Sequence, residues 1–438
     1  MPTADPATVS VPDVATAPAP APAPALDPVT DPAPLPTSPR GNGSIHATIS
    51  GTPFHALEIG DASHIGDGAI RREAAHRAII AWNELNHATE GGTPLSLPGT
   101  TGLYRNKVIE NGAAHVWPMS QIQAAALNIA SITDDDGAVR TLDSVMPRYI
   151  RNGAYQSSID HGGEKLRYTD DNMAIGLNFV QAYRQTGDRS YLAKAEAVMP
   201  FLESMIHANG GLNWREGSTA YVSDSIAGGQ KLALLLAQET DDPDKRERYI
   251  NFARTCDTFL EARLRATEGE KAGLVLDNVE STNEMKAWAD FIFSYNEGWS
   301  IGADIEWFKS TGDHSYLERA RRTADATLAY YSSVPFADGI WSQPPSFNAN
   351  FFENLLALEA IDPPADGSRP YEDRLRSYLD RAWTEARDPE TGWFEEGGIG
   401  SFTGGIFGTE HVDTIDQAGM VQMYALLAMT PEQRINAV

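Results

Sequence analysis

The stretch YTDDNMAIGLNFVQAYRQTGDRSYLAKAEAVMPFLESMI, residues 168–206, contains two helical patterns joined by a short turn. The first pattern is apolar on nearly every side, as in a helix that is buried all round. The second keeps its apolar residues on one face, as in a helix that borders water. Gly187 suits the left-handed position after a helix, and Asp188 can cap the next one. The stretch therefore predicts a helical hairpin with one inner and one outer helix.

The same hairpin pattern recurs along the chain. A second Thr-Gly-Asp turn lies at residues 311–313, and a Tyr-Leu pair follows the turn in both copies, at residues 191–192 and 316–317. A more divergent copy covers residues 224–260. Repeated units of this kind indicate a helical array in which each hairpin buries its apolar face against its neighbours.

Counting these patterns predicts six inner and six outer helices, so the expected fold is all-α, an (α/α)6 barrel (toroid) of six hairpins. The inner helices are expected to begin near Ser120, Asp171, Asp224, Asn296, Asn348 and Asp413. The outer helices are expected near residues 69–86, 136–149, 189–208, 243–266, 314–332 and 369–385.

The lengths of the connections predict where a functional site lies. Turns after the inner helices are short, whereas long segments precede the inner helices. These segments are residues 88–117, 150–169, 209–223, 267–294, 333–347 and 386–412. Because helix direction alternates around such a barrel, all six long loops and all six inner-helix N-termini should share one rim. Functional residues concentrate on loops of this kind, so we expect a site on that rim.

The composition excludes several classes of function. The chain has 438 residues, 42% of them hydrophobic, which is ample for a sizeable core. Its formal net charge of −26 makes it a poor candidate for binding nucleic acid or an anionic membrane surface. The single cysteine, Cys256, excludes an intrachain disulfide framework and a cysteine-based zinc site. No apolar run approaches the roughly 18–20 residues of a membrane span.

Residues 1–40 differ in composition from the rest of the chain. Twelve of these forty residues are proline, many in an alternating Ala-Pro pattern that favours polyproline II and forms no core. We expect a disordered, semi-rigid linker or stalk there and a single folded domain at residues 41–438. The N-terminus lacks the apolar region of a signal peptide. Stalks of this kind often join secreted or wall-bound domains to something else, although cytoplasmic proteins carry them too. We expect an extracellular or cell-envelope location. We also expect a monomer.

Aromatic, carboxylate and amide side chains gather on the predicted rim, where basic residues are sparse. This mixture suits sugars, whose C–H faces lie on aromatic rings while their hydroxyls bond to carboxylates and amides. Asp170 and Asp171 are the candidate catalytic pair. The candidate substrate-binding residues are Trp117, Gln121, Tyr168, Trp214, Asp224, Tyr295, Asn296, Glu297, Trp341, Phe347 and Gln417.

Each candidate also has a structural alternative. A tryptophan can serve packing, and Asp224 or Asn296 can cap a helix. For Asp170 and Asp171 one cap is enough, and a second adjacent carboxylate adds repulsion. His161 and His411, on rim loops, are the alternative acid/base candidates. No histidines have the spacing of a metal site, and no metal or other cofactor is expected.

Four stretches, in order, resemble glycoside hydrolase family 76, the endo-α-1,6-mannanases and their relatives. YTDDNMAIGL at residues 168–177 resembles the family's tandem-aspartate motif, and GGLNW at residues 210–214 resembles its Gly-Gly-x-x-Trp loop. SYNEGWSIGADIEWFKSTGD at residues 294–313 is similar to its Tyr-Asn-Gln-Gly segment, and IDQAGMVQMYALLA at residues 415–428 to its final inner helix. The chain departs from the family pattern at TAYVSDS, residues 219–225, where relatives show Lys-Asn-Ala-like residues.

The resemblance implies a glycosidase-like catalytic domain on a six-hairpin barrel and endo-acting hydrolysis of α-mannosidic linkages, α-1,6-mannan above all, with retention. It also implies that Asp170 is the nucleophile and Asp171 the acid/base. The expected partner is α-mannan or a related cell-wall glycan. Two alternatives stay open: a transglycosylase of cell-wall glycans on the same fold, and a glycan-binding module without activity.

Elementary chemistry is compatible with this pair. Retaining hydrolysis needs two carboxyls about 5–5.5 Å apart, one ionised and one protonated. Neighbours on a regular helix diverge by about 100°, but at a first turn both can face the rim. The helix N-terminus favours an ionised Asp170, and that charge raises the proton affinity of Asp171.

Overall fold

The structure is a computed structural model that describes residues 56–86, 102–106, 112–159, 165–279, 289, 291–333, 339–394 and 413–437. The linker predicted at residues 1–40 and the histidines at positions 161 and 411 lie outside these ranges. Among the described helices, none combines the length and the apolar character that crossing a membrane requires.

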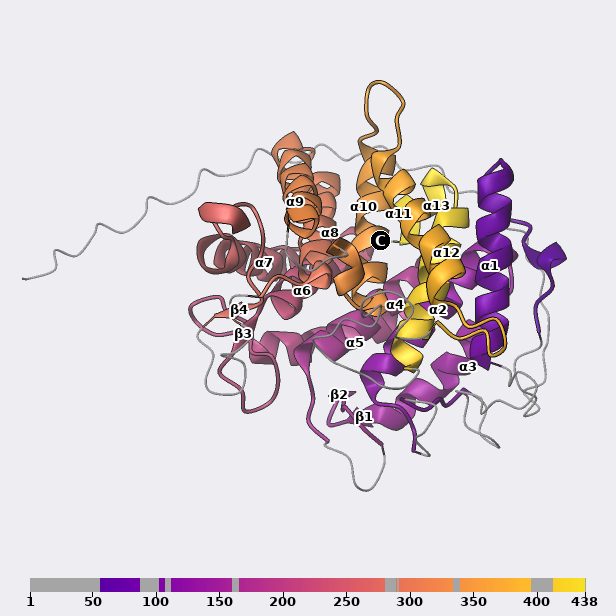
Figure 1. Ribbon diagram of the computed structural model, residues 1–438. Coiled ribbons are helices and arrows are strands. Elements are labelled where there is room, and N and C mark those ends of the chain that lie inside the picture. Colours follow the sequence, from indigo (N-terminus) through magenta and orange to yellow (C-terminus); the bar gives the residue numbers. More distant parts are fainter. Residues whose placement is uncertain are drawn as a thin grey trace, which may run out of the picture. The chain divides into compact units, whose positions relative to one another are not determined.

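Six helices form the inner ring, and their N-termini lie within a few residues of the predicted positions (Figure 1). They are α2 (Val116–Thr133), α4 (Thr169–Thr186), α6 (Ser223–Glu239), α8 (Ser294–Thr311), α10 (Pro345–Ile361) and α12 (Thr414–Ala428). Each helix packs against the next along the chain, and α12 packs against α2, which closes the ring. Nearly every residue of α6 and α12 is buried, as expected for helices enclosed on all sides.

Six further helices form the outer layer. They are α1 (Ala69–Asn86), α3 (Gly137–Val145), α5 (Arg189–Met205), α7 (Pro243–Phe259), α9 (His314–Ser333) and α11 (Pro370–Arg381). Helix α1 packs chiefly on α12, and each of the others packs on the inner helix that precedes it. The fold is therefore the predicted six-hairpin (α/α)6 barrel.

Short elements complete the described structure. A thirteenth helix, α13 (Pro431–Ala437), packs against α10 and α4. The strands β1 (Ile150–Arg151) and β2 (Ala154–Tyr155) pair with each other, as do β3 (Tyr221–Val222) and β4 (Asn278–Val279), both antiparallel. Single helical turns lie at Ile59–Asp61, Met146–Tyr149, Leu260–Leu264, Gly269–Lys271, Gly339–Ser342 and Ala382–Ala386.

The turns after α4 and α8 have the geometry that the sequence predicts. Gly187 and Gly312 both adopt φ = 72°, in the left-handed region that a side chain disfavours. Asp188 and Asp313 then accept the backbone N–H groups of Ser190 and Ser315, at 2.8 and 2.9 Å. These caps fix the reversal between each inner helix and the outer helix that follows it. Each outer helix therefore runs back to the rim on which the inner helices begin.

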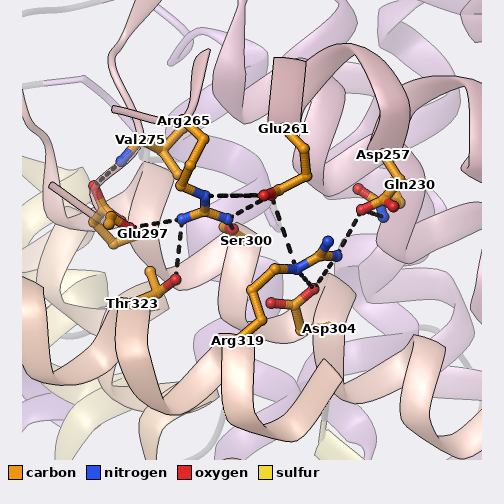
Figure 2. Close-up of polar contacts among 11 residues, drawn as sticks. Gln230, Asp257, Glu261, Arg265, Val275, Glu297, Ser300, Asp304, Arg319 and Thr323 are labelled. Atoms are coloured by element: carbon orange, nitrogen blue, oxygen red, sulfur yellow. Dashed lines mark hydrogen bonds and ion pairs between the residues drawn. The ribbon is translucent and has the colours of Figure 1, made fainter. Parts of the chain in front are cut away.

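A partly buried network of charged groups ties α7 and the turn after it to α8 and α9 (Figure 2). Arg319 of α9 bonds to Asp304 of α8 and to Asp257 of α7. Arg265 donates to Ser300 of α8 and to Thr323 of α9, at 2.9 and 3.0 Å. Because each guanidinium reaches two other elements, the network fixes how α8 is rotated about its own axis.

Candidate active site

A cavity of about 650 Å³ opens where the N-termini of the inner helices meet. Its wall combines aromatic rings, carboxyls and amides, and among the described residues it contains no lysine or arginine. Nine of the sequence-predicted site residues line it: Trp117, Gln121, Tyr168, Asp170, Asp171, Trp214, Asp224, Tyr295 and Phe347. The tertiary structure thus brings together residues from α2, α4, α6, α8, α10 and the loops before them.

Asp170 lies in the first turn of α4 and receives hydrogen bonds from two N–H groups. The indole Nε1–H of Trp214 donates to its Oδ2 at 2.9 Å, and the backbone N–H of Asp171 donates to its Oδ1 at 2.8 Å. Burial raises the pKa of Asp170 to about 6, although both donors act to lower it. Asp170 is therefore the carboxyl of the pair whose ionised form is the better solvated by the protein.

Trp214 reaches Asp170 because its loop is attached to the start of α4. The Thr169 N–H donates to the Trp214 carbonyl at 2.8 Å, and Tyr168 pairs with Arg215 in an isolated antiparallel bridge. The ring of Tyr168 also meets that of Trp214 edge to face, with centroids 5.0 Å apart. The GGLNW loop is thus held against the tandem aspartates.

Asp171 has a different environment from Asp170. Its side chain is buried, and both its burial and the neighbouring charge of Asp170 raise its pKa well above the ordinary aspartate value. A general acid must be protonated and a nucleophile ionised, and a protonated Asp171 beside an ionised Asp170 meets both requirements. Neither residue is the N-cap of α4, because that position is Tyr168 and no side chain caps there.

Two more carboxyls, those of Asp224 and Asp277, belong to the same cavity wall. The pairing of β3 with β4 brings them together, and the backbone N–H of Ser223 donates to the Asp277 carbonyl at 2.9 Å. Asp277 accepts hydrogen bonds from the Tyr295 hydroxyl at 3.2 Å and from the amides of Asn296 and Asn278, at 3.0 and 2.8 Å. Burial raises the pKa of both carboxyls.

Aromatic rings form a second part of the wall. Tyr295 meets Phe347 edge to face, with ring centroids 4.3 Å apart. The ring centroids of Trp117 and Phe347 are 6.0 Å apart. Trp117 is 43% exposed, so its ring is open to a ligand at the mouth of the cavity. Such surfaces match the C–H faces of sugar rings.

Four predicted site residues do not line the cavity: Asn296, Glu297, Trp341 and Gln417. The Asn296 amide donates a hydrogen bond to Asp277, which does line the cavity. Glu297 turns away toward Arg265 (Figure 2), and its Oε1 accepts the Val275 N–H at 2.8 Å.

Trp341 and Gln417 make contacts within the fold instead. Trp341 stacks on Tyr378 with centroids 4.5 Å apart, and the guanidinium of Arg381 lies over its ring. Gln417 bonds to both backbone groups of Phe394, at 3.1 and 2.8 Å. Both side chains contact other parts of the chain and lie outside the cavity lining.

Sequence reasoning missed several residues of the wall. Asp277 lies in the long loop before α8, so its place on a rim loop was a usable signal. Phe293, Asn350 and Asp413 also line the cavity. Asn350 lies inside α10, where the helical pattern alone favours packing. In the described part of the chain, no three His, Cys, Asp or Glu side chains are arranged to hold a metal ion.

Comparison with known proteins gives a family match, a curated relative and solved structures of the same fold. The family model "Glycosyl hydrolase family 76" matches residues 72–394. A meiotically up-regulated gene 191 protein of Schizosaccharomyces pombe is 24% identical over 250 residues, which cover 52% of this chain and 56% of that protein. The chain thus spans about half the length of this curated relative.

Two solved structures show the same fold at low sequence identity. A family 76 glycoside hydrolase from a bovine Bacteroides thetaiotaomicron strain has a TM-score of 0.64 and 21% identity, covering 82% of this chain and 78% of that one. An inactive variant of an α-1,6-mannanase from Salegentibacter sp. HEL1_6, in complex with α-1,6-mannotriose, has a TM-score of 0.64 and 17% identity. That match covers 81% of this chain and 99% of the other.

Proposed function

Because the chain belongs to glycosyl hydrolase family 76, we propose that it is an endo-acting glycoside hydrolase that cleaves α-1,6-mannan with retention. Asp170 is the nucleophile and Asp171 the acid/base. The α-1,6 linkage is inferred from the substrate named for the Salegentibacter structure. An enzyme for such a glycan acts outside the cell or in its envelope.

The observation that carries this proposal is the unequal environment of the two aspartates. Two donors stabilise the Asp170 carboxylate, whereas burial and the Asp170 charge favour a proton on Asp171. Asp171 protonates the leaving oxygen while Asp170 attacks the anomeric carbon. Asp171 then takes a proton from the water molecule that releases the sugar from Asp170.

The rest of the wall fits a neutral glycan. Without lysine or arginine among its described lining residues, the cavity offers little to a phosphate or carboxylate substrate. The rings of Trp117, Tyr168, Trp214, Tyr295 and Phe347 offer stacking faces, and Gln121 offers an amide for hydroxyls. These residues are the proposed substrate contacts.

The test is to measure Asp170→Asn and Asp171→Asn on α-1,6-mannan and on an activated aryl α-mannoside. Asp170→Asn should abolish turnover of both substrates with folding intact. Asp171→Asn should lose mannan cleavage but keep the first step on the aryl mannoside, because an activated leaving group needs little protonation. A covalent sugar should then accumulate on Asp170 and be visible by mass spectrometry.

Near-normal activity in both asparagine variants would end this assignment. Absence of new reducing ends from any α-mannan, with sugar binding retained, would favour a glycan-binding module. A transglycosylase uses the same covalent intermediate, so products are compared with and without an added acceptor sugar. Transfer products that exceed free reducing ends would favour the transglycosylase.

A further inference from the structure

Asp224 is a third carboxyl close to the proposed nucleophile, and it comes from a different helix. It lies in the first turn of α6 and is 7% exposed. Its Oδ1 accepts the backbone N–H of Ser225, and its side chain is within hydrogen-bonding reach of the Asp170 carboxyl. It is not the N-cap of α6, which is Val222, so capping does not account for its position.

A hydrogen bond between two carboxyls needs a proton on one of them. Asp170 already accepts the Trp214 indole N–H and the Asp171 N–H, and both favour its ionised form. Burial is the largest factor that opposes ionisation of Asp224, and the charges of Asp170 and Asp277 add to it. Its hydrogen bonds with Ser225 favour the ionised form but are outweighed. The shared proton therefore belongs on Asp224.

The surrounding titratable groups all favour the same assignment. Asp171 of α4 and Asp277 before β4 are carboxyls, and Tyr295 of α8 has a pKa raised well above the ordinary tyrosine value by burial and by nearby aspartates. His115 and Asp413 lie elsewhere on the cavity wall. No lysine or arginine among the described lining residues offsets these negative charges.

We propose that Asp224 is a positioning residue that keeps its proton and donates it in a hydrogen bond to the Asp170 carboxylate. With the Trp214 indole and the Asp171 N–H, it makes a third donor that fixes the rotation of the nucleophile. The same bond stabilises the carboxylate that forms again when the covalent sugar is released. The inference rests on the proposed role of Asp170 and assigns Asp224 a role other than direct contact with the sugar.

The test compares Asp224→Ala with Asp224→Asn. Alanine removes the donor to Asp170, so kcat should fall at least about tenfold. In the profile of kcat against pH, the acid limb, where kcat falls as the pH is lowered, should move up by about one pH unit. Asparagine keeps an N–H donor for Asp170 and an oxygen for the Ser225 N–H. It should therefore recover most of the lost kcat and return the acid limb toward that of the unmodified protein.

A matched control separates helix capping from this role. Asp188→Ala removes the cap of α5 at the outer layer, and it should lower the melting temperature without moving the pH profile. If Asp224→Ala behaves like Asp188→Ala, Asp224 serves only the helix. If Asp224→Asn loses as much as Asp224→Ala and the acid limb stays in place, Asp224 acts as an anion and the proposal is wrong.

A readout without turnover keeps this inference separate from the proposed function. The Asp170 carboxyl can be titrated by 13C NMR in aspartate-labelled protein, with Asp170→Asn used to assign its signal. Its pKa should rise in Asp224→Ala and return in Asp224→Asn, whether or not mannan is a substrate. An Asp170 pKa equal in all three proteins would overturn the inference, whereas loss of the mannanase assignment alone would not change this titration.

Discussion

Replacing Trp214 by phenylalanine isolates one hydrogen bond to the proposed nucleophile. The variant keeps an aromatic ring beside Tyr168 but loses the indole N–H that lies 2.9 Å from Asp170 Oδ2. That bond lowers the pKa of Asp170. Without it the pKa should rise, so the ionised nucleophile should be lost at a higher pH than in the unmodified protein.

The size of the effect follows from the worth of a hydrogen bond to a charged group, about 1.5–3 kcal/mol. Because Asp170 is partly open to the cavity, the lower value applies, and about 1.5 kcal/mol corresponds to about one pH unit. The acid limb, which lies near the Asp170 pKa of about 6, should therefore move toward about 7. Below both values kcat should be about tenfold lower than in the unmodified protein, and at alkaline pH the two should nearly agree.

The assay is kcat on saturating mannan oligosaccharide across pH roughly 4–9. Trp117→Phe is the matched control, because that ring also lines the cavity but contacts Phe347. It should change KM and leave the acid limb in place. An unmoved limb in Trp214→Phe, or an equal shift in both variants, would refute the reasoning.

Three further predictions concern stability and organisation. Burial raises the folded-state pKa of Asp171, so its carboxyl stabilises the fold at low pH and loses that contribution as pH rises through the folded pKa. Asp171→Asn should therefore raise the free energy of unfolding at neutral pH, and this gain should vanish in acid. A denaturant titration that shows a lower free energy of unfolding at neutral pH would contradict this prediction. Trp341→Ala should cost about 3–5 kcal/mol of stability and leave KM unchanged in the protein that remains folded. Trp117→Ala, at an exposed position, should raise KM with little loss of stability. If Trp341 bound sugar, calorimetry and kinetics would instead show a raised KM and little loss of stability for Trp341→Ala. Removing residues 1–40 should leave the melting temperature and the specific activity on soluble oligosaccharide intact, and a large loss of either would show that this segment packs on the domain.

The sequence alone determined the hairpin fold and the rim that carries the candidate site. Helical periodicity separates buried from water-facing helices, and it depends only on local spacing. The Gly-Asp turns are local too, because a left-handed residue and a capping carboxylate act within a few positions. The short turns and long loops then placed Asp170, Asp171, Trp214 and Asp224 at one end of the barrel.

Only the tertiary structure decided which side chains point into the cavity. Successive residues on a helix diverge by about 100°, so Tyr295 faces the cavity while Glu297, two positions later, faces Arg265. The rotation of α8 that makes this choice is fixed by contacts with α7 and α9, which are distant in sequence. The protonation of the four aspartates is likewise a tertiary property, because desolvation and the meeting of α4, α6 and the β3–β4 pair set it.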